Sequence, residues 1–300
     1  MPQIDDLVQT YLTACEVEGK SPNTVWSYRT SLADFRRTGR RLGLPDAIAD
    51  YTVRDVYAFL DEVRGRGVSA AYRHRRHREV KAFFSWCKRV DIIPENVFAR
   101  VPLVKLEQQI IQPFSAADIQ ALLGAQDRSQ HHDCRNYALI LFLLDTGVRA
   151  SECISVRLDD VDWERRRVRV LHGKGQKQRW VGVGERTIAA LREYIERFRG
   201  DQDDNLFLGS RCRHPIATAH ALHVILRRMA ERVGLKKVHP HRFRHTFATW
   251  AIRASAREID VQSLLGHSSL AMVQRYARTY SSEQAVAAHA SFSPVGQLAS

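Results

Sequence analysis

Six side chains suited to phosphate chemistry are spread over the second half of the sequence: Arg149, Lys174, His241, Arg244, His267 and Tyr276. Guanidinium groups bind phosphate oxygens, imidazole can donate a hydrogen bond or accept a proton, and lysine can act as an acid. A tyrosine oxygen becomes a nucleophile when a base and nearby cations lower the barrier. Taken singly, each residue has a plainer interpretation, such as a salt-bridge arginine, a solvated lysine or a core tyrosine.

The pair His241 and Arg244 favours a phosphate over a metal. Pro240 is expected to begin a helix, which places the two side chains three residues apart on one face. A zinc site at His241 and His245 is disfavoured, because no glutamate stands between them and Arg244 would repel a cation. The sequence also has no GxxxxGK[ST] loop and no paired carboxylates in motif context. We therefore expect neither a metal nor a cofactor.

Four motifs follow one another along the second half: TGVRASE, HGKGQKQR, the HxxR pair at His241, and LLGHSSL with Tyr276 nine residues after His267. In this order they resemble the tyrosine recombinases of the phage integrase and Xer type, in their simple two-domain form. The resemblance extends over essentially the whole chain. It is specific in the second half and diffuse in the amino-terminal helices, which resemble the family's core-binding domain.

The resemblance implies a role for each residue of the set. Tyr276 would attack a DNA phosphodiester, giving a 3′-phosphotyrosyl link and a free 5′-hydroxyl. Arg149 and Arg244 would hold the non-bridging oxygens, and His267 would be a third donor to them. His241 would assist proton transfer at Tyr276. Strand exchange would then run through a Holliday junction without ATP.

The acid that protonates the departing 5′-oxygen is one of two lysines in the HGKGQKQR turn. Lys174 lies between two glycines and matches the family's GKG position, whereas Lys177 follows three residues later. Glycines allow the backbone to approach DNA closely, so we favour Lys174 as the acid. Lys177 is expected to contribute mainly to DNA affinity.

The expected partners are a double-stranded DNA core site and further copies of the chain, monomeric when free and tetrameric on DNA. A directionality factor or a partner recombinase would be an additional partner. The pair Ala277-Arg278 and the tail after Ser281 differ from those usual in Xer proteins. A mobile-element integrase or resolvase is therefore favoured over Xer-type dimer resolution and over DNA relaxation of the type IB topoisomerase kind.

Positive charge supports a polyanionic partner. The chain has 46 Lys and Arg against 33 Asp and Glu, a net charge of +13. The densest basic stretch runs from Arg64 to Arg89 on an expected helix, whose charged face is either simply solvated or directed at phosphates. The candidate DNA contacts are Arg73, Arg75, Arg76, Arg78 and Lys81 in this stretch, with Lys177, Arg179 and Arg242 in the second half.

Length and local patterns predict two domains. A chain of 300 residues is about twice the usual single-domain size. Residues 1–104 are expected to form a helical, SAM-like DNA-binding domain, 105–113 a linker, and 114–300 a catalytic domain with a carboxy-terminal tail. Helix starts are predicted at four capping residues, Ser21, Thr52, Ser69 and Ser115.

The second domain is predicted to be α+β. Helices are expected over 137–144, 185–199 and 217–233, and a hairpin over 168–183, where valines alternate with polar residues. The fold class is therefore mostly α with a small antiparallel β-sheet.

Neither a membrane span nor a disulfide framework is expected. The longest apolar run, 137–144, is far shorter than the roughly 18 residues a span needs. The five cysteines include no CxxC pair and are expected to be buried thiols. The amino terminus lacks the basic flank and apolar stretch of a secretory signal, so a cytoplasmic location is expected.

Overall fold

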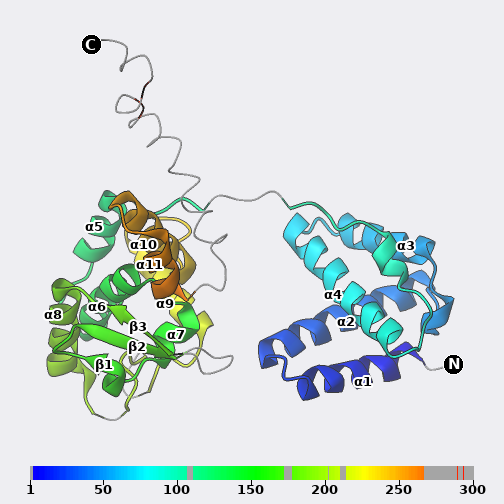
Figure 1. Ribbon diagram of the computed structural model, residues 1–300, viewed down its shortest axis with the longest axis horizontal. Coiled ribbons are helices and arrows are strands. Elements are labelled where there is room, and N and C mark those ends of the chain that lie inside the picture. The colour runs from blue at the N-terminus through cyan, green and yellow to red at the C-terminus, as the bar shows by residue number, and fades with distance from the viewer. Residues whose placement is uncertain are drawn as a thin grey trace. The chain divides into compact units, whose positions relative to one another are not determined.

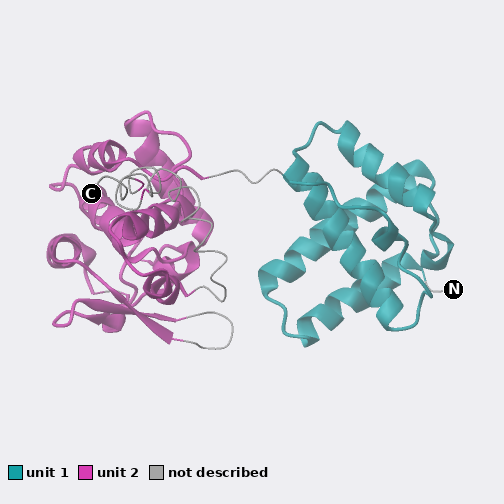
Figure 2. Cartoon of the chain, turned by 45° about the horizontal axis from the view of Figure 1, so that its top comes forward, with its two compact units in different colours: residues 1–109 teal, residues 110–300 magenta. Residues whose placement is uncertain are grey.

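The computed structural model describes residues 3–106, 111–171, 178–201, 203–209 and 214–266, together with His289 and Ser293. The chain divides into two compact units, Met1–Gln109 and Ile110–Ser300, shown in teal and magenta in Figure 2. The division falls inside the segment 105–113 that the sequence predicts as a linker.

Unit 1 is helical and is built around aromatic side chains. Its α-helices are α1 (Ile4–Val17), α2 (Pro22–Leu42), α3 (Val53–Gly65) and α4 (Ala70–Arg89). The hydroxyls of Ser21 and Ser69 accept hydrogen bonds from backbone N–H groups at the starts of α2 and α4, and Thr52 begins α3, as predicted. The rings of Phe35 and Phe59 lie 5.0 Å apart at the centre of the unit.

Unit 2 combines helices with one antiparallel sheet of strand order β1-β2-β3 (Figure 1). The sheet consists of β1 (Val161–Asp162), β2 (Arg167–Leu171) and β3 (Gln178–Gly182), so the predicted hairpin is confirmed. Its helices are α5 (Ala116–Gly124), α6 (His131–Thr146), α7 (Ala150–Ser155), α8 (Glu185–Tyr194), α9 (Ala219–Arg232), α10 (Pro240–Arg253) and α11 (Glu258–Leu265). The predicted fold class, mostly α with a small antiparallel sheet, is confirmed.

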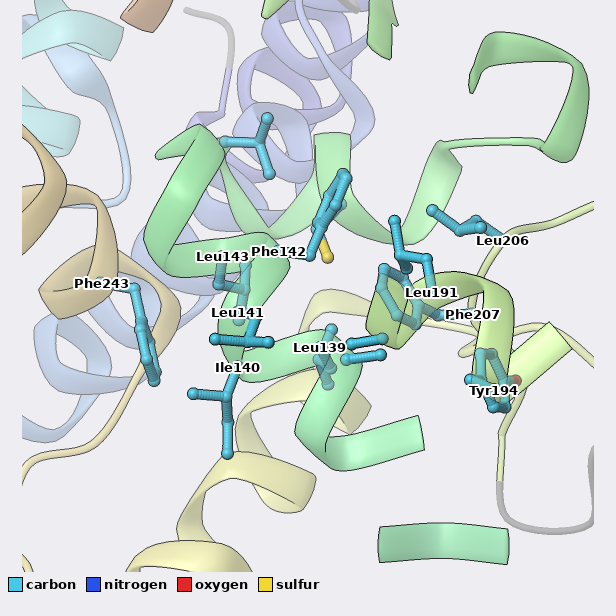
Figure 3. Packing of buried hydrophobic residues seen from close by; sticks show 14 of the residues in the cluster. Leu139, Ile140, Leu141, Phe142, Leu143, Leu191, Tyr194, Leu206, Phe207 and Phe243 are labelled. Atoms are coloured by element: carbon cyan, nitrogen blue, oxygen red, sulfur yellow. The ribbon is translucent and has the colours of Figure 1, made fainter. Parts of the chain in front are cut away.

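Helix α6 is the centre of the unit 2 core. It packs against α5, α8 and α10, and Figure 3 shows its apolar residues 139–143 beside Leu191 and Tyr194 of α8 and Phe243 of α10. Burial on most sides explains the continuous apolar run in the sequence.

The structure extends α6 beyond the predicted range 137–144. Its first turns are polar, and within them Arg135 is buried and its side chain donates to the backbone carbonyls of Leu208 at 3.0 Å and Gly209 at 2.9 Å. These partners lie over seventy residues away, so the apolar pattern gives no indication of them. Helices α7 and α11 and strand β1 are likewise not predicted from the sequence.

Two further findings concern the expectations drawn from composition. Cys15, Cys87, Cys134 and Cys153 are free and buried, as predicted. Within the described part of the chain, no helix is long and apolar enough to cross a membrane.

Candidate active site

Three arginines from different elements meet at the carboxyl end of α11. This helix packs against α10 and β3, and its last residues with the following glycine, Leu264–Gly266, are here called the α11 end (Figure 1). The hydrogen bonds pair each side chain with one of three consecutive carbonyl oxygens: Arg179 Nε with Leu264 at 2.6 Å, Arg244 Nη2 with Leu265 at 2.7 Å, and Arg149 Nη2 with Gly266 at 3.3 Å. The last carbonyls of a helix lack partners within the helix and carry partial negative charge, so guanidinium donors suit them.

A buried carboxylate joins two of these arginines. The side chain of Glu152 is only 5% exposed. It accepts hydrogen bonds from Nη1 of Arg149 at 2.9 Å and from Nη1 and Nη2 of Arg179 at 3.1 and 2.8 Å. The backbone N–H of Arg149 donates to the same carboxylate at 2.8 Å. Burial alone would raise the pKa of Glu152, but the hydrogen bonds from Arg179 and from the Arg149 backbone outweigh it and lower the pKa to about 2.

Arg244 is held between the carboxyl ends of two helices, α6 and α11. Its guanidinium is buried and donates to the carbonyl of Gly147 at 2.8 Å as well as to the α11 end. Gly147 ends α6 with φ +59°, and a Cβ there would lie 2.7 Å from Cδ1 of Phe247. The turn therefore requires glycine both for its conformation and for space.

His241 lies near the positive charges of Arg149 and Arg244, here called the arginine pair. It is accessible to solvent and stands one turn before Arg244 on α10. Desolvation by surrounding atoms, followed by the charges of Arg244 and Arg149, lowers the pKa of His241 below its ordinary value of 6.5. The imidazole is therefore neutral at pH 7 and can accept a proton. Arg149, Arg244 and His241 are thus the members of the predicted set that the described structure brings together.

Four predicted residues, Lys174, Lys177, His267 and Tyr276, lie outside the described residues. In the sequence, His267 directly follows the α11 end. Among the residues that the structure does describe, no group of three or more His, Cys, Asp or Glu side chains could hold a metal ion.

The basic residues of α4 fall into two groups. Arg75 and Arg78 are exposed, and Arg73 and Lys81 are partly buried. Arg76 is only 4% exposed; its guanidinium contacts Ser31 and lies 3.5 Å from the carboxylate of Asp34. Arg76 is therefore part of the interior of unit 1, and the geometry does not support its predicted role as a DNA contact.

Arg242 connects α10 to the chain that enters unit 2. Nε donates to the carbonyl of Gln112 and Nη1 to that of Lys236, both at 3.0 Å, and the guanidinium lies 4.0 Å from the centre of the Phe114 ring. Asp118 is a further partner, at 3.4 Å. Two arginines that stand two positions apart on α10 therefore make different contacts: Arg244 binds the α11 end, while Arg242 holds the chain that enters unit 2.

Comparison with known proteins assigns the family. Residues 112–283 match the phage integrase family, and residues 8–90 match its N-terminal SAM-like domain. The chain belongs to the phage integrase family. It is therefore a tyrosine recombinase, an enzyme that transfers DNA strands.

Relatives and solved structures agree with this assignment. Tyrosine recombinase XerC of Oceanobacillus iheyensis is 32% identical, with 92% of both chains covered, and that of Bacillus subtilis is 30% identical over the same shares. The Tn1549 transposon integrase in complex with circular intermediate DNA shares the fold of the recombinase at a TM-score of 0.76. Its sequence is 22% identical, and 90% of this chain and 94% of that chain are covered.

Sequence reasoning missed Glu152 as a functional residue. It stands at the end of the motif TGVRASE, three residues after Arg149, a spacing that brings two side chains together at a helix start. That spacing is the sequence signal that indicates a contact between Glu152 and Arg149. Its second partner, Arg179, is 27 residues further along the chain and could not be inferred locally.

Replacing Arg242 tests whether it stabilises unit 2 or contacts DNA. Because three carbonyls and Asp118 would lose their charged donor, Arg242→Ala is expected to lower the stability of unit 2 by about 2 kcal/mol. Hydrogen exchange of α10 in the full chain measures this. Arg227→Ala, which removes an exposed arginine from α9, is the control. Unchanged exchange together with weaker DNA binding and a smaller salt dependence would make Arg242 a DNA contact instead.

The lowered pKa of Glu152 predicts a pH-dependent contribution to stability. The folded-state pKa lies below the unfolded value of 4.5, so the contribution is present above pH 4.5 and is lost as the pH falls towards 2. Its size is about 3 kcal/mol. The advantage of wild type over Glu152→Gln, measured by urea unfolding of unit 2, should shrink over that range. Glu185→Gln, at an exposed carboxylate, serves as the control, and a pH-independent advantage would contradict the assignment.

Proposed function

We propose that the recombinase cleaves and rejoins DNA at a specific core site through a covalent 3′-phosphotyrosyl intermediate formed by Tyr276. Arg149 and Arg244 bind the non-bridging oxygens of the scissile phosphate, and His267 adds a third donor. Lys174 protonates the 5′-oxygen as it leaves. The tyrosine–phosphorus bond forms as the bond from phosphorus to the 5′-oxygen breaks, and His241 accepts the proton of the phenol.

The convergence of Arg149 and Arg244 at the α11 end, with His241 one turn before Arg244 and within reach of both charges, is the observation that carries this proposal. A phosphodiester gains negative charge as the pentacoordinate transition state forms, so fixed cations stabilise that state more than the ground state. The fixing is visible in the hydrogen bonds that each guanidinium makes to main-chain carbonyls. Cations already held in place need no reorganisation during the reaction.

DNA binding outside the reaction centre is assigned to the basic residues that are available at the surface. Arg75 and Arg78 of α4 are exposed and three residues apart, so they share one face of the helix. Arg73 and Lys81 of the same helix are partly exposed and complete the surface set, whereas Lys177, outside the described residues, is assigned from the sequence alone. Four subunits on two duplexes, exchanging strands through a Holliday junction, form the active assembly, with a directionality factor or partner recombinase as an additional component.

The proposed biological use is the integration or resolution of a mobile element. The residues Ala277-Arg278 after the nucleophile and the tail beyond Ser281 support this use, because they differ from those usual in Xer proteins. Xer-type recombination is the second candidate, and the relatives named tyrosine recombinase XerC favour it. The DNA that the enzyme cleaves, either the flanks of an encoding element or a chromosomal site, decides between them.

Covalent trapping tests the nucleophile. With a suicide substrate that loses the 5′-hydroxyl fragment after cleavage, wild type is expected to form a 3′-linked adduct in the presence of EDTA. Tyr276→Phe lacks the attacking oxygen and should form none. Tyr280→Phe removes a tyrosine only four residues away and should leave the adduct yield unchanged. An adduct with Tyr276→Phe, or none with wild type in EDTA on DNA that it binds, would refute the mechanism.

The lowered pKa of His241 predicts how cleavage depends on pH. Because the neutral ring accepts the proton, activity is lost only when the pH falls through the His241 pKa, which lies below 6.5. Single-turnover cleavage should therefore stay constant from pH 7.5 to about 6.5 and decline below it. A decline already centred above pH 6.5 would contradict the proton-acceptor role.

A further inference from the structure

Arg179 links three elements of unit 2 although it is not one of the family's reaction residues. It belongs to β3, its side chain is only 12% exposed, and it contacts both Glu152 at α7 and the carbonyl of Leu264 in α11. Its guanidinium also packs against the next turn, since a Cβ added to Gly266 would lie 3.1 Å from Nη1. Every one of these contacts lies within the protein, so the geometry does not support the predicted role as a DNA contact.

The contacts of Arg179 lead directly to the arginine pair. Glu152, which accepts two hydrogen bonds from Arg179, also accepts one from the side chain and one from the backbone of Arg149. The carbonyls that follow Leu264 accept hydrogen bonds from Arg244 and Arg149. A shift of Arg179 would therefore move one partner of each catalytic arginine.

We propose that Arg179 is a positioning residue: it fixes Glu152 and the α11 end, and these in turn hold Arg149 and Arg244 in the geometry that binds the scissile phosphate. The inference rests on the proposed function of the arginine pair. Arginine suits the position because its planar fork spans both carboxylate oxygens while Nε remains for the carbonyl; lysine has a single charged nitrogen and cannot make this set of contacts.

The first test separates binding from cleavage. Arg179→Lys keeps the charge but loses the fork, so single-turnover adduct formation at saturating DNA should fall about 100-fold, the cost of a misplacement of about 1 Å. DNA affinity should change less than about threefold. If Arg179 contacts DNA instead, affinity and its salt dependence will fall while the rate at saturation is retained, which would overturn the proposal.

Arg169→Lys is the matched control. Arg169 lies on β2 opposite Trp180, on the other face of the same sheet, and its Nε donates to Asp160 at 2.9 Å. The substitution removes a similar charged fork from the sheet without touching the α11 end. Its cleavage rate should stay within about twofold of wild type. A loss as large as that of Arg179→Lys would mean that any disturbance of the sheet slows cleavage, and would overturn the specific role.

A substrate whose scissile phosphate is uncharged tests whether Arg179 acts through Arg149 and Arg244. A purely structural role would slow cleavage of charged and uncharged substrates equally. Replacing one non-bridging oxygen of the scissile phosphate by methyl removes the charge that Arg149 and Arg244 neutralise. If Arg179 acts through that pair, the ratio of the wild-type cleavage rate to the Arg179→Lys cleavage rate should be at least tenfold smaller on this substrate. An undiminished advantage would overturn the proposal.

A double substitution keeps the test decisive if Arg179→Lys does not fold. Replacing both Arg179 and Glu152 by Met removes the most buried ion pair of the site as a unit, a change that proteins often tolerate, and leaves Arg149 its hydrogen bond to Gly266. The double variant is expected to fold and bind DNA yet cleave at least 100-fold more slowly; cleavage at the wild-type rate would overturn the proposal. Absence of an adduct with wild type would instead count against the proposed function, so the two failures are distinguishable.

Discussion

The carboxyl end of α11 sets the main constraint on the active site. A helix end leaves carbonyl oxygens without intrahelical partners, and here three of them accept hydrogen bonds from three guanidinium groups carried by separate parts of unit 2. Each arginine therefore has its direction fixed by main-chain atoms. Because such acceptors do not depend on side-chain identity, the arrangement requires only that α11 end at this position, and Gly266 in the left-handed region ends it there.

The convergence of like charges needs compensation, which Glu152 provides only in part. Three guanidiniums meet at the α11 end but only two of them, those of Arg149 and Arg179, contact the one described carboxylate, and the helix end contributes partial negative charge but no full one. The described part of the site is therefore positive overall, and the lowered pKa of His241 keeps that imidazole from adding a further charge. In the proposed reaction, a phosphate that gains negative charge completes the balance, so the positive site stabilises the transition state more than the ground state.

Local sequence patterns predicted the elements that depend on neighbouring residues. The caps at Ser21, Ser69 and Ser115, the hairpin, and the start of α10 at Pro240 are set by interactions within a few positions. The motifs also predict Arg149, His241 and Arg244 as one set, and the structure brings these three residues together.

The remaining features depend on contacts between distant parts of the chain. The hydrogen bond from Arg179 to Leu264 joins residues 85 positions apart in the sequence, and the one from Arg242 to Gln112 joins residues 130 positions apart. A basic residue next to a motif is compatible with either a phosphate contact or an internal partner, and only the folded chain distinguishes them. The charge run in α4 shows the same limit, since Arg76 and Arg78 stand two positions apart and only one of them is buried.

The large net charge of the chain is therefore a poor measure of its DNA-binding surface. Arg36, Arg76, Arg135, Arg199 and Arg244 are all nearly inaccessible, and they serve carboxylates and carbonyls inside the units. Arginine is suited to this use because it stays charged when buried and donates in several directions at once. The residues that attract DNA at a distance are the exposed ones, whereas the proposed phosphate ligands, partly exposed Arg149 and buried Arg244, are held by hydrogen bonds to main-chain carbonyls. At the α11 end, the hydrogen bonds that hold Arg149 and Arg244 inside unit 2 are also the ones that their proposed catalytic role requires.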